Sequence, residues 1–279
     1  MHRVLTGPLR LETATVAIAD LPEHLHGIKI IQLSDFHYEG WGLSEQLLQE
    51  AIATSNREDP DLVVLTGDYV TQDPAPIRQL VDRLKTLKHR AGIYAVLGNH
   101  DIKPPEAQVK IIQALTHAGI RVLWNEVAYP FGNGLALVGM ADLYSGEFKP
   151  APVLMPIAPK TPRIVLSHNP ATAEILRKWR VDLQLSGHTH GGQIVLPIVG
   201  PIPTKLKAIR SWVPQLLRPW LPWMQDCYKV YNHWHWCEGF YRVGPNALYV
   251  NRGLGTYFPG RFFCPPEVTA IVLKSGLSE

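Results

Sequence analysis

Short runs of apolar residues, each followed by a polar cluster, recur through the first two thirds of the chain. The runs are rich in Ile, Val and Leu and are bounded by Gly and Asp, a pattern typical of buried β-strands. They occupy Ile28–Ser34, Asp61–Thr66, Ile93–Leu97, Arg163–Ser167 and Asp182–Ser186. This spacing predicts a sheet whose strands are too apolar to be exposed on either face.

Helical patterns separate the first three runs. Ser44 can cap one helix, Pro76 lies near the start of a second, and a third begins near Pro104 and stops at Gly119. Alternation of strand and helix predicts parallel or mixed pairing with right-handed crossovers.

After Gly119 the order of elements changes. Shorter strand-like pieces follow at 127–129, 135–139, 240–243, 247–251 and 268–273. The Pro-rich stretch Lys149–Pro162 is typical of a loop over the surface. Two sheets packed face to face, with helices outside, account for both parts of the chain. We therefore expect an α/β fold.

The polar clusters after the five runs share one set of chemical groups, namely carboxylate, imidazole and carboxamide. Ligands bind beyond the carboxyl ends of strands in open α/β sheets, so we expect the clusters to face one site. Seven side chains there are typical metal ligands: Asp35, His37, Asp68, Asn99, His168, His188 and His190. Seven ligands are too many for one ion and indicate two.

Two divalent ions suit the hydrolysis of phosphate esters, because they activate a shared water and clamp phosphoryl oxygens. One carboxylate must then bridge them, and Asp68 is the candidate because it stands alone after Gly67 at a strand end. Asp35 and His37, at i and i+2, would point to the same side of an extended backbone and hold one ion. His188 and His190 could divide between the ions. A donor set without thiolate favours Mn or Fe, with Zn as a further candidate, over Ca.

Composition limits the other functions that the chain can have. Its 279 residues, 46% of them hydrophobic, suit one large domain over residues 1–279. A net charge of +3 argues against a nucleic-acid partner. The three cysteines do not suggest a disulfide framework, and the N-terminus has no apolar export segment. We expect a cytoplasmic protein, at most peripheral on the inner face of a membrane.

The ordered series D-x-H, G-D, G-N-H-D, H and G-H-x-H, from Asp35 to His190, resembles the calcineurin-like metallophosphoesterases. This resemblance implies a four-layer fold, with two mixed β-sheets packed as a sandwich and flanked by helices. It also implies that Asp35, His37, Asp68 and His190 hold one metal ion, while Asp68, Asn99, His168 and His188 hold the other. His100 would contact the phosphoryl group and protonate the leaving oxygen, with Asp101 orienting His100. The reaction would be in-line attack of metal-bound hydroxide.

Departures from the family pattern limit the class of substrate that we expect. The protein phosphatases of this superfamily continue with an Asp-Arg pair where this chain has Thr71 and Gln72, and they carry Arg where it has Leu97. Without these clamps for a phosphomonoester dianion, a phosphodiester or pyrophosphate is favoured. The tail Leu248–Glu267 is similar to a bacterial phosphodiesterase subfamily with lipid-directed members that split UDP-2,3-diacylglucosamine. Arg252 and Arg261 could contact substrate phosphate or form surface salt bridges.

An aromatic and basic insert, at about 202–237, stands apart from these motifs. Its segment Lys205–Trp223 carries four basic residues, several Trp and no acid. Three prolines there allow only short helical turns. Three interpretations remain: a packed subdomain, a lid that contacts the membrane beside the site, and a surface that docks a partner. We favour the lid, since Trp flanked by cations is typical of bilayer interfaces.

The leading hypothesis is thus a binuclear-metal phosphodiesterase or pyrophosphatase, acting on a lipid-linked or nucleotide-sugar-lipid substrate. A phosphomonoesterase for a small phosphorylated metabolite is the alternative enzyme. A catalytically inactive scaffold that kept the fold is the alternative from another class.

Overall fold

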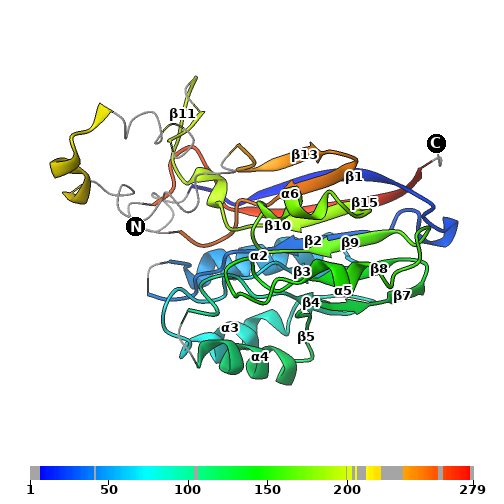
Figure 1. The fold of residues 1–279 in the computed structure, drawn as a ribbon. Helices are drawn as coiled ribbons and strands as arrows, with labels where there is room; N and C mark the ends of the chain where they lie inside the picture. Colours follow the sequence, from blue (N-terminus) through cyan, green and yellow to red (C-terminus); the bar gives the residue numbers. More distant parts are fainter. Residues whose placement is uncertain are drawn as a thin grey trace.

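The computed structural model describes residues 7–40, 42–103, 106–198, 200–202, 205, 212–220, 235–256 and 260–276. Two six-stranded sheets lie face to face, and helices cover their outer faces (Figure 1). The predicted α/β sandwich of two mixed sheets flanked by helices is confirmed.

The first sheet combines both ends of the chain with the early strands. Its order is β1 (Arg10–Ala19), β15 (Glu267–Gly276), β2 (Lys29–Leu33), β3 (Leu62–Leu65), β4 (Ile93–Ala95) and β5 (Arg121–Val122). Strands β2 to β5 are parallel, whereas β15 runs antiparallel to β2 and parallel to β1. The carboxyl ends of β2, β3 and β4 therefore lie at one edge.

The second sheet contributes the remaining two predicted strand ends. Its order is β13 (Gly239–Val243), β14 (Asn246–Val250), β10 (Leu183–Ser186), β9 (Arg163–Leu166), β8 (Ala136–Gly139) and β6 (Glu126–Ala128). The four central strands are parallel, and the two edge strands are antiparallel to their neighbours. Outside the two sheets, β7 (Pro130–Asn133) precedes β8, and β11 (Val195–Leu196) and β12 (Gly200–Pro201) form a hairpin.

Helices cover each sheet from outside. Against the first sheet pack α2 (Glu45–Arg57), α3 (Ile77–Leu84) and α4 (Ala107–His117), and against the second pack α5 (Pro150–Leu154) and α6 (Thr172–Leu176). The Ser44 hydroxyl accepts a hydrogen bond from the amide of Leu47 at 3.2 Å, so the predicted cap of α2 is confirmed. The predicted start of α4 near Pro104 lies outside the described residues. Short 3-10 turns η1 (Glu23–Leu25), η2 (His190–Gly192) and η3 (Gln215–Trp220) complete the structure.

Side chains alternate along the strands, so each strand contributes to the core between the sheets and to the core under the helices. In β3, Leu62 and Val64 lie in the cluster between the sheets, whereas Val63 and Leu65 lie in the cluster under the helices. All four are almost completely buried. The continuous apolar runs in the sequence thus correspond to strands that are covered on both sides.

Two parts of the sequence fold differently from expectation. Strand β1 was not predicted, because much of it is exposed and its pattern mixes small and polar residues. The segment Lys149–Pro162 is not simply a surface loop, since it contains α5 and buries Val153, Leu154 and Ile157 against the second sheet.

The insert at about 202–237 falls largely outside the described residues. Within its described part, η3 is a single short turn, in agreement with the expectation from its prolines. No helix among the described residues has the length and apolar character needed to cross a bilayer.

Candidate metal centre

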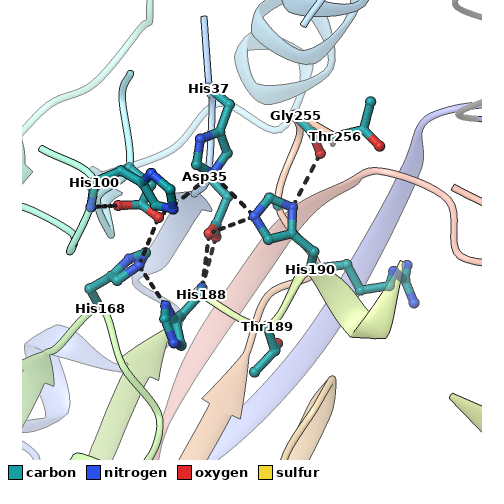
Figure 2. A network of polar contacts seen from close by, with 12 residues as sticks. Asp35, His37, His100, His168, His188, Thr189, His190, Gly255 and Thr256 are labelled. Atoms are coloured by element: carbon teal, nitrogen blue, oxygen red, sulfur yellow. Dashed lines mark hydrogen bonds and ion pairs between the residues drawn. The ribbon is translucent and has the colours of Figure 1, made fainter. Parts of the chain in front are cut away.

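Side chains from four of the five predicted polar clusters form two adjoining groups where strands of both sheets end. In Figure 2 the imidazoles lie together with the carboxylate of Asp35: His37, His100, His168, His188 and His190. In each group, the ligand atoms lie within 4.8 Å of one another. Sequence order and strand direction therefore bring together the predicted side chains.

The first group consists of Asp35, His37 and His190, all of them buried. The Nε2 atoms of His37 and His190 are 3.1 Å apart, and His190 Nε2 lies 3.4 Å from Asp35 Oδ1. Two ring nitrogens and a carboxylate oxygen so close together are the donors that a transition metal prefers.

The second group consists of Asp68, His168 and His188. His168 Nε2 lies 3.1 Å from Asp68 Oδ2 and 3.2 Å from His188 Nδ1. Asp68 Oδ2 is also 3.6 Å from His37 Nε2, which belongs to the first group. Asp68 thus stands between the two groups, and His188 and His190 are divided between them.

Backbone and hydroxyl oxygens orient three of the rings from behind. Nδ1 of His168 lies 2.7 Å from the carbonyl of Thr66, Nδ1 of His190 lies 3.3 Å from that of Gly255, and Nδ1 of His37 lies 3.2 Å from Thr71 Oγ1. An N–H donated outward leaves Nε2 as the inward-facing donor atom for a metal. The sequence did not reveal these partners, because none of them belongs to a ligand motif.

The backbone is left-handed at five of the seven candidate ligands. The φ angle is +52° at Asp35, +43° at His37, +56° at Asp68, +73° at His188 and +52° at His190. Asp35 and His37 belong to the same group, as expected. The expected reason, an extended backbone, is wrong, because the backbone at both residues is left-handed. Non-glycine residues in this region are strained, and such strain concentrates at functional sites.

The absence of a side chain at Gly98 leaves room for Asp68 of the second group. A Cβ atom on Gly98 would lie 2.1 Å from Asp68 Oδ1 and 2.7 Å from the Asp68 amide nitrogen. No side chain fits there, so the glycine before Asn99 is a steric requirement of the site.

His100 lies beside the two groups and outside both. Its amide donates to Asp68 Oδ1 at 2.9 Å, and its Nδ1 donates to the carbonyl of Thr71 at 2.8 Å. The ring meets that of His37 edge to face, with centroids 5.1 Å apart. This places a half-buried imidazole at the edge of the candidate metal centre.

Asp101 does not orient His100, so that prediction is wrong. Its Oδ2 accepts hydrogen bonds from the amides of Asp68 and Gly98, and its Oδ1 accepts from those of Tyr69 and Val70. Burial, followed by the charge of Asp68, raises the pKa of Asp101 to about 8. The carboxylate ties the loop after β3 to the loop after β4, which is a structural role.

Electrostatics make the centre attractive to cations. Burial opposes a charge on His168, but Asp68, Asp35 and Asp142 outweigh it and raise the pKa of His168 to about 10. Burial, followed by the charge of His168, lowers the pKa of His188 to about 3. The buried carboxylates thus draw positive charge toward their own position, where a divalent ion would supply it.

Two orphaned atoms also fit a metal. Asn99 Oδ1 and His188 Nε2 are buried, and neither has a hydrogen-bond partner among the described residues. Buried polar atoms are normally paired, so these two need an explanation. A coordinated cation would give Asn99 Oδ1 a partner, and the place of Asn99 in the second ligand set stays a prediction. His188 faces His168 with its other ring nitrogen, Nδ1.

Arg252 forms salt bridges, which is one of its two expected roles, whereas Arg261 bonds to no acid among the described residues. Arg252 pairs with Glu12, Glu238 and Glu267 and is partly buried. Arg261 is almost fully buried and donates to backbone carbonyls. Both guanidinium groups are already engaged by the protein.

Comparisons with known proteins agree with this geometry. Residues 28–192 match the family of calcineurin-like phosphoesterases. Phosphodiesterase YaeI of Escherichia coli is 35% identical over 88% of this chain and 82% of its own length. The uncharacterized metallophosphoesterase YkuE of Bacillus subtilis is 33% identical over 96% of this chain and 87% of its own. UDP-2,3-diacylglucosamine pyrophosphatase LpxG of Chlamydia muridarum is 26% identical over 88% and 83%.

A solved structure with 12% identity aligns over 81% of this chain at a TM-score of 0.50, a likeness of fold alone. The family match covers the strand ends that carry both ligand groups, from Asp35 to His190. The chain therefore belongs to the calcineurin-like phosphoesterase family and is a metal-dependent hydrolase of phosphoester bonds.

Proposed function

We propose that this protein hydrolyses a phosphodiester or pyrophosphate bond with the help of two divalent metal ions. The observation that carries the proposal is the pair of adjoining ligand groups with Asp68 between them. Asp35, His37, Asp68 and His190 would hold one ion, and Asp68, Asn99, His168 and His188 the other. Mn or Fe suits these donors best, and Zn suits them next.

When bound, such a pair of ions supplies a nucleophilic water at neutral pH and neutralises charge on the phosphoryl oxygens. The protein's own contribution is rigidity. Each ring has an outward hydrogen bond or a fixed neighbour, and the left-handed turns hold the donors in place before any ligand arrives. Preorganised groups need no rearrangement during the reaction.

His100 is proposed to move the proton that the leaving oxygen needs. Its bond to the carbonyl of Thr71 places one hydrogen on Nδ1, so Nε2 is the nitrogen that would exchange a proton with the substrate. No donor atom of His100 belongs to either ligand group among the described residues. Its proposed task is therefore proton transfer, separate from metal binding.

The residues at these family positions support a substrate with less phosphate charge, because Gln72 and Leu97 stand where the protein phosphatases carry arginine. Leu97 is fully buried, and Thr71 uses its hydroxyl and carbonyl to hold His37 and His100. Neither can grip a phosphomonoester dianion as a guanidinium does. The names of two relatives, a phosphodiesterase and a pyrophosphatase, agree with this bias.

Comparing a diester with a monoester of the same leaving group tests this proposal. With Mn²⁺ present, we expect kcat/KM for bis(4-nitrophenyl) phosphate to exceed that for 4-nitrophenyl phosphate by about tenfold or more, the effect of about 1.4 kcal/mol in the transition state. Faster cleavage of the monoester would instead support the phosphomonoesterase hypothesis.

We further propose that the substrate is lipid-linked and that the protein meets it at a membrane surface. The β11–β12 hairpin and the turn η3 project from one end of the molecule (Figure 1). Large apolar side chains in or near these elements and at Phe262 and Phe263 are exposed: Ile198, Trp212, Leu216, Leu217, Phe262 and Phe263. We call this set the aromatic end. Trp212 is 87% exposed and Phe263 67% exposed, which is costly in water and favourable in a bilayer interface.

The aromatic end adjoins the metal centre. Phe262 bridges to Ile194, and its amide and carbonyl bond to Gln193 and Val195, which follow His190 directly in the chain. Lys205 is exposed within a segment of the sequence that has four basic residues and no acid. Anionic lipid therefore complements this end in both polarity and charge.

Vesicle binding provides the measurement. Replacing Phe262 and Phe263 together by Ser should weaken binding to phosphatidylglycerol vesicles by about tenfold or more, since each buried Phe contributes roughly 1.5–3 kcal/mol. Deleting Lys205–Trp223 should also weaken it. Phe240→Ser, an exposed Phe on β13, is the matched control and should bind as wild type does. Equal co-sedimentation of all forms would refute membrane contact.

A further inference from the structure

Arg261 carries a buried charge that pairs with no carboxylate. Its side chain bonds to the carbonyls of Gly255 (2.6 and 3.1 Å), Arg252 (2.6 Å), Gly253 (3.1 Å) and His190 (3.2 Å), and it lies 3.7 Å from Cys264 Sγ. Within the described part of the chain, none of its hydrogen bonds goes to an acid. Burying a guanidinium without a contacting acid costs free energy, so the arrangement needs a reason.

The carbonyls belong to two loops that meet at the first ligand group. One is the loop 252–255 after β14, which lies directly behind Asp35. Leu254 donates to the carbonyl of Ser34 at 3.0 Å, and Gly255 donates to that of Asp35 at 2.7 Å. The other is the turn η2 that carries His190. Arg261 therefore fastens the support of Asp35 to the support of His190.

The Arg261 guanidinium also holds the orientation of the His190 ring. The carbonyl of Gly255 accepts from Arg261 and also lies 3.3 Å from His190 Nδ1. Arg261 Nη2 also lies 3.4 Å from His190 Nδ1, so the guanidinium and the Gly255 carbonyl both contact the outer edge of the ring, while Nε2 faces Asp35 and His37. A shift of the Gly255 carbonyl would release both the ring and the loop behind Asp35.

We propose that Arg261 is a positioning residue that sets the cation affinity of the Asp35, His37 and His190 group, while the Asp68, His168 and His188 group does not depend on it. This inference rests on the proposed two-metal function. A guanidinium suits the task because its planar fork reaches carbonyls from two loops at once. A lysine ammonium has three donors at one point and cannot span them.

The charge of Arg261 and its hydrogen-bond geometry predict opposite effects of substituting Arg261 on metal binding by the first group. A fixed cation beside a divalent ion repels it, so if charge alone mattered, removing it would tighten binding to the first group. If geometry matters, losing the fork weakens binding whether the charge is kept or not. Arg261→Lys keeps the charge, and Arg261→Gln removes it while retaining one donor.

Titrating metal-stripped protein with Mn²⁺ and recording its paramagnetic resonance spectrum tests this proposal. Wild type should bind two Mn²⁺ with a spin-coupled signal. Arg261→Lys and Arg261→Gln should each bind one ion with wild-type affinity and the second about 10–100-fold more weakly, as for other groups that orient metal ligands. Their spectra should show an isolated Mn²⁺.

Arg163→Lys is the matched control and should retain the coupled pair, because Arg163 is also buried and donates to backbone carbonyls (Thr161, Leu154 and Ala158), but at the end of β9 away from the ligand groups. The thermal unfolding midpoint of each metal-free variant shows whether the variant folds. If Arg261→Lys does not fold, Arg261→Gln carries the test. Two ions bound normally by both Arg261 variants, tighter binding in Arg261→Gln, or equal loss at both groups would overturn the inference. A wild type that binds fewer than two ions would contradict the proposed function instead.

Discussion

Asp68→Asn should reduce phosphodiester hydrolysis by about a thousandfold or more. Asp68 Oδ2 lies 3.1 Å from His168 Nε2 and 3.6 Å from His37 Nε2, so it is the acceptor that both ligand groups share. An amide at this position removes one negative charge and can direct N–H hydrogens at a cation. Two-metal assistance stabilises a transition state by several kcal/mol, and about 4 kcal/mol corresponds to a factor of roughly a thousand.

The same variant should lose metal. Elemental analysis after dialysis is expected to give two ions per chain for wild type and at most one for Asp68→Asn. Asp73→Asn is the matched control, since Asp73 is an exposed carboxylate in the loop that follows Asp68 and accepts a bond from Ala75. Two ions and more than half the normal rate in Asp68→Asn would contradict the assignment of Asp68 as the bridging ligand.

Much of the fold could be predicted from sequence because burial determines its pattern. Strands β2, β3, β9 and β10 are covered on both faces and therefore appear as continuous apolar runs. Strand β1 was missed for the opposite reason. It is partly exposed, and its neighbour in the sheet is β15, more than two hundred residues away along the chain. Such a long-range pairing leaves little trace in a local pattern.

The members of the site were predictable, but their mutual arrangement was not. Parallel strands of one sheet end at one edge, so the proximity of Asp35 and Asp68, after β2 and β3, follows from strand order. His168 follows β9 in the second sheet, so its approach depends on how the two sheets pack. The left-handed backbone at Asp35 and His37 could not be predicted, since it depends on contacts with loops from elsewhere in the chain. Gly255, for example, donates to the carbonyl of Asp35 from 220 residues away, a separation evident from the sequence numbering.

His100→Asn should slow catalysis and leave metal binding intact. Replacing a general acid typically lowers the rate by about 10²–10⁴-fold. The amide of residue 100 would still donate to Asp68 Oδ1, so the second ligand group keeps its support. A series of aryl diesters measures the effect, because poor leaving groups need protonation most. The loss should therefore grow from 4-nitrophenyl to phenyl esters. A uniform loss across the series would argue against proton transfer by His100.

Asp101→Asn separates proton transfer from scaffolding. Asp101 is fully buried, and its two oxygens accept from the amides of Asp68, Gly98, Tyr69 and Val70. An asparagine keeps one acceptor and turns a donor toward the remaining amides, at a cost of about 1–3 kcal/mol for each unsatisfied group. Urea denaturation should therefore show a loss of about 2–5 kcal/mol for Asp101→Asn and little change for His100→Asn. If Asp101 instead assisted His100 directly, its substitution would steepen the leaving-group dependence without lowering stability.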